Sequence, residues 1–367
     1  MRLVSTFVAL VTTAVATLSV ATPALAISPT ETAQILAGMS QSDATLGDEK
    51  AGVLAGYTKK TAELWAKWDE RIGAPMRSWA ATELPRAPGE TIFYPFAGPD
   101  FPTVQVLYPD ANRYVLVALQ TGGPMPDFSA MEKKSLNGYL RTFRHGWESF
   151  TLRGFYDTDD LKRDNPLLQG ITPALVAFAV RLGYGVEKVE PIRINASGSD
   201  VEIHPGDRNT LATWDSVRIT LSRPASSGFP AATVLLDYLF VDLSDGNLQK
   251  HKNEGAWVTM MSKQKVVTKA ASHLMQKPFF SLVRDAILDN TPILFQDETG
   301  IDYSDLEKRF DVTLYGKFTK ANKLFMKGVQ RSLAKAYKKK DQVKPLPFKV
   351  GYKKESGSCV QVATRRR

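Results

Sequence analysis

An uncharged, apolar run from Leu3 to Val20 occupies the N-terminus of this 367-residue chain. It follows one positive charge, Arg2, and precedes Pro23-Ala24-Leu25-Ala26, so the segment has the basic start, apolar centre and small-residue exit of a cleavable export signal. We expect cleavage between Ala26 and Ile27, which makes residues 1–26 a signal peptide. No later segment reaches the ~18 uncharged apolar residues that a membrane span needs. The mature chain must therefore fold around a core of its own.

The N-terminal signal also predicts where the protein works. A Sec-type signal delivers a bacterial protein to the periplasm or the medium, so we expect an extracytoplasmic protein with no transmembrane anchor after cleavage. A helix start follows directly, because Ser28 can cap, Pro29 suits the first turn and Glu31 can close a capping box. The single cysteine, Cys359, excludes an internal disulfide framework. A buried side chain is the favoured interpretation of Cys359, with a reactive thiol as the alternative.

The net charge of +9 is divided unevenly along the chain. Residues 316–367 contain 16 Lys and Arg against two acidic residues, a net of +14, whereas residues 27–315 carry a net of −6. Within the basic end, cationic side chains step by three or four residues along a helix predicted over Phe318–Tyr337. They are Lys320, Lys323, Lys327, Arg331, Lys335 and Lys338.

This basic amphipathic C-terminal helix has two interpretations. It can contact an anionic envelope polymer, a lipid surface or an acidic protein, or it can be a solvated helix that covers the acidic remainder of its own fold. Export removes nucleic acid as the natural partner.

Mixed helix and strand patterns predict an α+β fold, with a mixed or antiparallel sheet flanked by helices. Residues 27–88 form an N-terminal helical segment, and residues 89–367 form the main domain, with a subdivision near residue 250 as an option. Strand patterns occupy residues 103–107, 114–120, 201–203, 217–221, 233–241, 257–261, 292–296, 348–352 and 359–362. Helix patterns occupy residues 48–81, 131–150, 171–183, 265–275 and 279–288. The first two strands would form a hairpin, residues 245–247 a turn, and no regular βαβ period is visible.

The signatures of the common cofactor and metal sites are absent from the chain. There is no G-x-G-x-x-G, P-loop, G-x-S-x-G, H-E-x-x-H or C-x-x-C, and the four histidines lack ligand spacing. We therefore expect no cofactor and no metal. Ser262-Lys263-Gln264-Lys265 fits the S-x-x-K pattern of penicillin-binding serine enzymes, but S-x-N and K-T-G do not follow it. A helix cap is the favoured role of Ser262.

The segment after the predicted strand at 292–296 is the first candidate site. Asp297 and Glu298 follow that strand directly and precede Gly300, an arrangement that can serve general acid–base catalysis or ligand binding. Asp302 is a further candidate for ligand binding. The alternative is that Asp302 caps the next helix and that Gly300 only permits a turn.

A second candidate site lies in residues 94–101, which are dense in aromatic, Pro and Gly residues. Such a loop is rigid, so it can wall a ligand pocket with Tyr94 and Asp100, or it can be a well-packed turn. Thr121-Gly122-Gly123-Pro124 follows a predicted strand and can bring the backbone close to a ligand.

Four segments resemble motifs of a family of secreted bacterial proteins that has no established activity. They are YPFAGPDF (94–101), YVLVALQ (114–120), QDETGIDY (296–303) and TLYGKF (313–318). The resemblance covers most of the chain after residue 89. It implies bacterial export and a shared core, and it implies no reaction, cofactor or catalytic residue.

Two hypotheses on function follow. The first is an accessory envelope protein that binds a ligand or partner through the 94–101 and 296–303 loops. The second is a hydrolase that acts on an envelope component, with Asp297, Glu298 and Asp100 as candidate acid, base or ligand groups. Convergence of Asp100 with the other two carboxylates in one cleft would favour the enzyme, because proton transfer requires hydrogen-bond reach.

Overall fold

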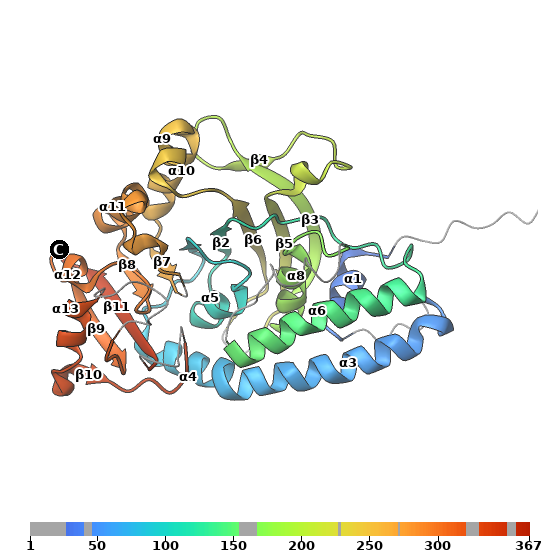
Figure 1. Ribbon diagram of the computed structural model, residues 1–367, viewed down its shortest axis with the longest axis horizontal. Coiled ribbons are helices and arrows are strands. Elements are labelled where there is room, and N and C mark those ends of the chain that lie inside the picture. Colours follow the sequence, from blue (N-terminus) through green and yellow to red (C-terminus); the bar gives the residue numbers. More distant parts are fainter. Residues whose placement is uncertain are drawn as a thin grey trace, which may run out of the picture.

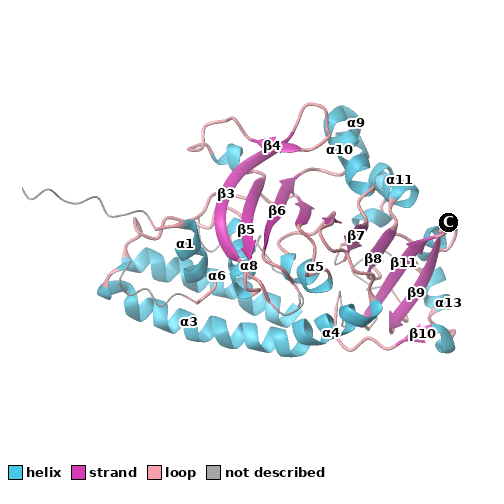
Figure 2. Cartoon of the chain, turned by 180° about the vertical axis from the view of Figure 1, so that it is seen from behind, coloured by secondary structure: helices cyan, strands magenta, loops and turns pink. Residues whose placement is uncertain are grey.

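One mixed sheet runs through the computed structural model, which describes residues 27–39, 46–153, 167–226, 229–270, 272–320, 330–350 and 357–367. Within these residues the sheet has eleven strands in the order β10-β9-β11-β8-β7-β1-β2-β6-β5-β3-β4 (Figures 1 and 2). The predicted signal, Ala26 included, lies outside the described residues. The predicted α+β class with a mixed sheet flanked by helices is confirmed.

The strands are β1 (Thr91–Tyr94), β2 (Arg113–Ala118), β3 (Gly185–Ile194), β4 (Val201–Ile203), β5 (Val217–Arg223), β6 (Ala232–Phe240), β7 (Val266–Lys269), β8 (Ile293–Gln296), β9 (Phe310–Gly316), β10 (Val343–Lys344) and β11 (Cys359–Arg365). The principal helices are α1 (Pro29–Leu36), α3 (Asp48–Trp68), α4 (Ala74–Glu83), α5 (Phe101–Leu107), α6 (Lys133–Arg153), α8 (Thr172–Arg181), α9 (Asp245–Lys250), α10 (Lys252–Ser262), α11 (Ser281–Asn290), α12 (Tyr303–Leu306) and α13 (Arg331–Ala336).

The centre of the sheet is parallel. Strands β8, β7, β1, β2 and β6 lie side by side and run in one direction. Antiparallel strands extend both sides: β11 lies between β8 and β9, and β5, β3 and β4 follow β6. Strand β1 pairs with β2 on one side and with β7 on the other, so strands from before and after residue 250 belong to the same sheet.

Helices cover both faces of the sheet, because successive residues of a strand point to opposite faces. On β1, Ile92 and Tyr94 join the core beneath α1, α3, α4, α5, α6 and α8, whereas Phe93 joins the core beneath α9, α10, α11 and α12. Trp257 of α10 meets the Phe93 ring edge-on at 5.8 Å. The fold is therefore a three-layer arrangement of helices, sheet and helices.

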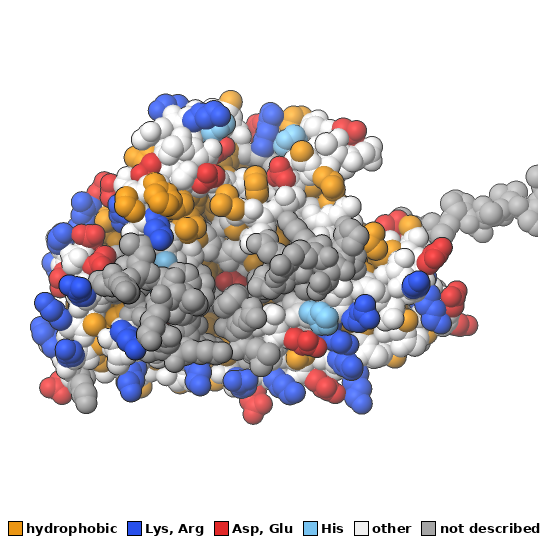
Figure 3. All heavy atoms as spheres, viewed as in Figure 1, with side chains coloured by type: hydrophobic (Ala, Val, Ile, Leu, Met, Phe, Trp, Pro, Cys, Tyr) orange, Lys and Arg blue, Asp and Glu red, His pale blue; other side chains and the backbone are white. Residues whose placement is uncertain are grey.

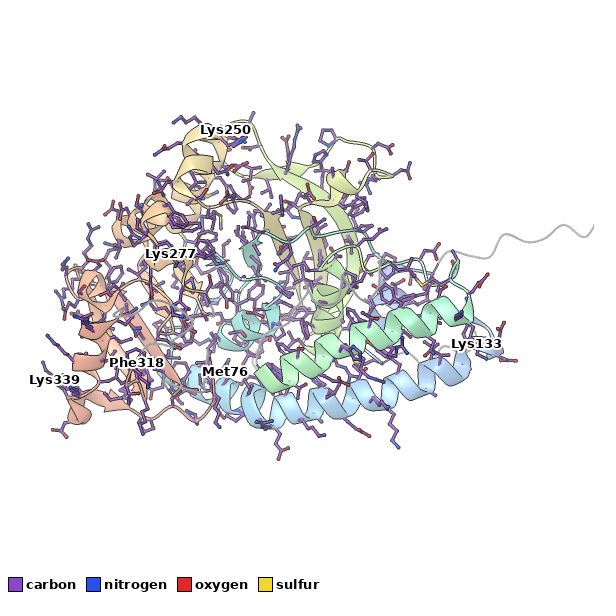
Figure 4. The ribbon with its side chains drawn as sticks, viewed as in Figure 1. Met76, Lys133, Lys250, Lys277, Phe318 and Lys339 are labelled. Carbon is purple, nitrogen blue, oxygen red and sulfur yellow. The ribbon has the colours of Figure 1, made fainter. Side chains whose placement is uncertain are left out.

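The N-terminal helical segment forms largely as predicted. At the start of α1, the Ser28 side chain accepts from the Glu31 amide at 3.2 Å and the Glu31 carboxylate accepts from the Ser28 amide at 3.0 Å, which is the expected capping box. Helix α3 continues through the π-helical turn η1 (Asp69–Gly73) into α4, so one helical run occupies the range of the helix pattern predicted over residues 48–81. It packs along α6 (Figures 1 and 2), and Lys133 and Met76 lie near the two ends of this helical layer (Figure 4).

Four local predictions are wrong, and two of them concern short segments that the fold buries completely. Residues 103–107 belong to helix α5, and residues 257–261 to helix α10, instead of strands. Residues 266–269 form strand β7 instead of a helix, and residues 245–247 begin helix α9 instead of a turn. All seven residues of α5 and all four of β7 are buried, so their hydrophobic pattern has no period that separates helix from strand.

The described residues do not form one continuous helix over Phe318–Tyr337. Gln330 adopts a left-handed conformation, with φ of 62°, which an α-helix does not accommodate, and among the described residues of this range only Arg331–Ala336 is helical. Residues 317–320 are not helical, and Lys323 and Lys327 lie outside the described residues. Phe318 still packs as expected, since it is buried and its ring lies 6.0 Å from that of Tyr337. Residues 348–350 do not form the predicted strand.

None of the helices in the described ranges combines the length and the apolar character needed to cross a bilayer.

Candidate functional site

A pocket of about 250 Å³ opens at the carboxyl ends of the parallel strands. Its walls come from the segments that follow β1, β2, β6 and β7, together with Phe280 ahead of α11. The chain leaves β1 through α5 on one face of the sheet and leaves β7 towards α11 on the other face. Two neighbouring strands whose connections diverge in this way define a topological switch point, the usual place for a ligand in an open α/β sheet. We call this cavity the switch-point pocket.

The predicted loop 94–101 forms one wall of the switch-point pocket. Residues 96–100 line it, and Phe96 has a positive φ of 60°, a conformation that non-glycine residues rarely adopt. The Phe96 ring meets the Phe280 ring edge-on at 5.4 Å. Asp100 lines the pocket and is only 6 % exposed. The structure thus gives this loop the wall position that its composition suggested, and backbone strain at such a position is typical of binding sites.

The switch-point pocket has a mixed lining. Asp100, Gln120, Asp242 and Ser272 bring polar side chains to it, and the remaining side chains are mainly apolar or aromatic. The lining residue Leu119 is exposed, as are Phe240 and Phe279, which adjoin the lining residues Val241 and Phe280 in the chain. Figure 3 shows hydrophobic side chains gathered over the region of α11. A lining of this kind suits a ligand with a polar end and an apolar end.

A buried lysine lies behind the Phe96 wall. Lys269, the last residue of β7, is fully buried, and its Nζ lies 5.9 Å from the centre of the Phe96 ring. The ammonium group donates to the carbonyl oxygens of Ala270 and Ser272. It also donates to Thr299 Oγ1, at a distance of 3.4 Å. Burial lowers the pKa of Lys269 to about 8, although the nearby carboxylates of Asp297 and Glu298 act in the opposite direction.

The predicted carboxylates Asp297 and Glu298 are fully buried beside this lysine and do not line the switch-point pocket. Asp297 Oδ1 accepts from the Thr299 amide at 2.9 Å and from the Thr299 hydroxyl. Four glutamines hold the backbone of the same loop by side-chain hydrogen bonds: Gln276, Gln296, Gln330 and Gln361. The loop therefore presents its carboxylates in rigid positions behind the pocket.

Cys359, at the start of β11, is fully buried against the same loop. Its Sγ lies 3.5 Å from Glu298 Oε2, to which it donates a hydrogen bond. Burial raises the pKa of the Cys359 thiol, and the carboxylates of Glu298 and Asp297 raise it further. The structure agrees with the buried interpretation of this cysteine, because a thiol held protonated and enclosed is a poor nucleophile.

Electrostatic effects link the two predicted loops. Burial raises the pKa of the Tyr94 phenol, and the carboxylates of Asp100 and Asp297 each raise it further. Asp100, at the pocket wall, and Asp297, behind it, therefore both act on the hydroxyl group at the end of β1. Convergence of the three carboxylates in one cleft is not what the structure shows, because Asp100 lines the switch-point pocket, whereas Tyr94, Asp297 and Glu298 do not.

The remaining predicted positions have structural partners. Asp302 caps α12: its Oδ1 accepts from the Ser304 amide at 2.9 Å and from the Ser332 hydroxyl at 3.0 Å. Burial alone would raise the pKa of Asp302, and these hydrogen bonds lower it. At Gly300 a Cβ atom would lie 2.2 Å from Gln296 Oε1, so this glycine permits the close turn of the loop.

The two glycines after β2 pack against backbone from two other segments of the chain. Gly122 and Gly123 donate to the carbonyl oxygens of Asp215 and Trp214, and a Cβ atom at Gly123 would lie 2.6 Å from the Gln169 carbonyl oxygen. The close approach is therefore to backbone instead of to a ligand.

Ser262 has a structural role that differs from the predicted helix cap. It is buried as the last residue of α10, and its hydroxyl donates to the Thr259 carbonyl oxygen at 2.7 Å. Among the described residues, no group of three or more His, Cys, Asp and Glu is arranged to hold a metal ion.

The described residues include four of the six cations predicted to contact a polyanion. Lys320, Arg331, Lys335 and Lys338 are exposed. Helix α13, which carries Arg331 and Lys335, lies at the end of the molecule formed by β9 and β10, where Phe318 and Lys339 also lie (Figures 1 and 4). The break at Gln330 means that Lys320 and Arg331 do not lie on one continuous helix.

Sequence reasoning did not identify Lys269, Thr299 or the pocket residues Gln120 and Asp242. The signal for Lys269 was a charged residue at the end of the apolar run Val266-Val267-Thr268, a pattern typical of a buried parallel strand that ends at a site. Assignment of this run to a helix concealed that signal.

Comparisons of the chain with protein families, with characterised proteins and with solved structures find no match.

Proposed function

We propose that this is an exported envelope protein that binds a small amphipathic molecule in the switch-point pocket. The observation that carries the proposal is the place of the pocket: four segments that follow adjacent parallel strands enclose it where the chain connections diverge. Export is inferred from the N-terminal signal, and mass spectrometry of the purified mature protein should find Ile27 as its first residue.

The lining indicates the chemistry of the ligand. Asp100 and Asp242 offer carboxylate acceptors, and Gln120 and Ser272 can donate or accept. Amino or hydroxyl groups at one end of the ligand could donate to these carboxylates. An apolar group at the other end would contact Phe280 and the exposed hydrophobic residues at the mouth.

Small molecules that co-purify with the protein provide the test. Ala118→Phe adds a ring to the pocket lining at the end of β2, whereas Ala212→Phe adds the same ring at an exposed position away from the pocket. We expect mass spectrometry to detect a compound on the wild type and on Ala212→Phe, and to find it missing from Ala118→Phe. The same set of compounds on all three proteins would contradict the proposal.

A second candidate function is acid–base hydrolysis of the bound molecule. The position of Asp100 supports it, because this carboxylate is almost fully buried in the wall of the pocket, a setting typical of general acids and bases. In this case Asp100→Asn should lower kcat by about 100-fold or more with little change in KM. The exposed Asp285→Asn serves as the control. A kcat unchanged by Asp100→Asn would exclude Asp100 as the acid or base.

A further inference from the structure

A second pocket, of about 270 Å³, lies at the opposite edge of the parallel strands. Its walls come from α4, the connection after α4, the end of α5 and the segment that leads into β2 (Figure 1). Most of the lining is apolar, with Ala80, Leu84, Val106 and Leu107 among the wall residues. This cavity, which we call the α4–α5 pocket, shares no residue with the switch-point pocket.

Guanidinium groups surround the mouth of the α4–α5 pocket. Arg77 and Arg86 line it, and the Phe229 ring has the guanidinium carbons of Arg86 and Arg223 at 5.8 and 5.9 Å from its centre. Arg86 pairs with Asp110 through Nε at 2.7 Å, and its side chain is 64 % exposed. Its terminal nitrogens make no hydrogen bond to any described residue. They are therefore available to an anion at the mouth.

The wall of the same pocket contains an unsatisfied hydroxyl group. Tyr108, at the end of α5, is 1 % exposed, and its hydroxyl group is buried without a hydrogen-bond partner among the described residues. Buried hydroxyl groups in native proteins are normally hydrogen-bonded, so the Tyr108 hydroxyl is an unused donor in a residue of the pocket wall.

We propose that the α4–α5 pocket binds a single-chain amphipathic carboxylate, with the chain against the apolar walls and the carboxylate at Arg86 and Arg77. The small volume excludes lipids with two acyl chains, since drug-sized ligand pockets begin at about 300 Å³. Arg86 pairs with Asp110 and Arg77 pairs with Asp69, so the selection comes from the donor nitrogens that remain on the two guanidinium groups, whose planar fork matches a carboxylate. This inference is independent of the ligand of the switch-point pocket.

Decanoate is the probe, with decanol as its uncharged counterpart, and both are titrated into the mature protein by calorimetry below the concentration at which decanoate forms micelles. We expect decanoate to bind about tenfold more tightly than decanol. Arg86→Gln should weaken the binding of decanoate about tenfold and leave the binding of decanol unchanged, because it removes the positive charge and keeps part of the aliphatic side chain. Arg71→Gln, at an exposed position outside the pocket, is the matched control and should bind as the wild type does.

A blocking variant tests the location. Ala81 lines the pocket from an exposed position on α4, so Ala81→Trp fills the cavity without entering the core, and it should abolish decanoate binding. Ala118→Phe, which narrows the switch-point pocket, should leave decanoate binding unchanged, which keeps the two sites distinguishable. No binding at ~1 mM decanoate, equal affinity for decanol, or binding that survives Ala81→Trp would each overturn the proposal.

Discussion

The ammonium group of Lys269 lies 3.4 Å from Thr299 Oγ1, and the same hydroxyl group donates to Asp297 Oδ1. Lys269 ends β7, and the other two residues follow β8, the parallel neighbour of β7. One hydroxyl group therefore joins a buried cation to a buried carboxylate across two strand ends. This hydrogen-bond pair connects the end of β7, next to the switch-point pocket, to the loop that follows β8.

The pKa of Lys269 predicts a dependence of stability on pH. Because the folded chain lowers this pKa from 10.5 to about 8, the unfolded chain binds the proton more strongly. Below about pH 8 both states are protonated and the contribution is constant. Between about pH 8 and 10.5 the folded state has lost the proton that the unfolded state retains, so the contribution of Lys269 to the free energy of unfolding rises by about 3 kcal/mol.

Urea titrations at about pH 7.5 and 10 measure this effect. The free energy of unfolding of the wild type minus that of Lys269→Met should increase from about pH 7.5 to about pH 10. The subtraction cancels the contributions of the other titrating groups, because both proteins contain them. Lys263→Met, at an exposed neighbouring position, should show no such change. A difference for Lys269→Met that is independent of pH would contradict the assigned burial of the charge.

We expect a large loss of stability when the negative charge of Asp237, in the middle of β6, is removed. This fully buried carboxylate lies 2.7 Å from Arg113 Nη2 and 2.6 Å from Arg218 Nε. Asp237→Asn leaves two guanidinium groups without their buried counter-charge and should lower the free energy of unfolding by about 3 kcal/mol. Asp311→Asn, whose carboxylate is 78 % exposed in its pair with Arg366, should cost less than about 0.5 kcal/mol. Denaturant unfolding measures both, and equal losses would refute the assignment.

Two glycines predict opposite effects of the same substitution. A Cβ atom at Gly170 would lie 2.2 Å from the Gly122 carbonyl oxygen, so Gly170→Ala should destabilise the protein by about 1–3 kcal/mol. Nothing lies within 4 Å of a Cβ atom at Gly138, inside α6, and Gly138→Ala should stabilise by about 0.4–1 kcal/mol. Thermal unfolding should therefore shift the melting temperature down for the first and up for the second.

The exposed cations near the C-terminus predict salt-dependent attachment to anionic surfaces. Binding of the mature protein to anionic vesicles should weaken as salt rises towards ~0.5 M, because screening acts on exposed charges. Replacement of Arg331, Lys335 and Lys338 by Glu should abolish it, and the matched triple replacement of Lys59, Lys60 and Lys67 on α3 should have a smaller effect. Absence of binding at low salt, or binding insensitive to salt, would leave these cations as a solvated surface.

The elements that sequence predicts best are those with an exposed side. The α1 capping box, α6, α11 and strand β5 have polar or partly exposed residues at regular intervals, and these mark the period. At the sheet centre that contrast disappears. Phe101–Leu107 and Val266–Lys269 are buried throughout, so a helix and a strand have the same apolar pattern, and the parallel order that follows from them was not visible.

The candidate sites divide in the same way. Residues 94–101 and 296–303 could be selected from sequence, because aromatic, glycine and acidic residues seldom gather directly after buried strands without a structural or functional reason. Their partners could not be selected, since Lys269, Gln120 and Asp242 come from distant segments that only the sheet order brings to the same edge.

Sequence by itself therefore determined the α+β class, the α1 capping box and the loops at which to look, and it predicts the export signal, because each of these depends on neighbours along the chain. Only the tertiary structure decided that five central strands are parallel, that Asp297 and Glu298 lie behind the pocket instead of in it, and that the chain has a second cavity lined by arginines. These features depend on strand pairing between residues far apart in the sequence. They also depend on burial, which changes the pKa of a side chain and cannot be read from the residue type alone.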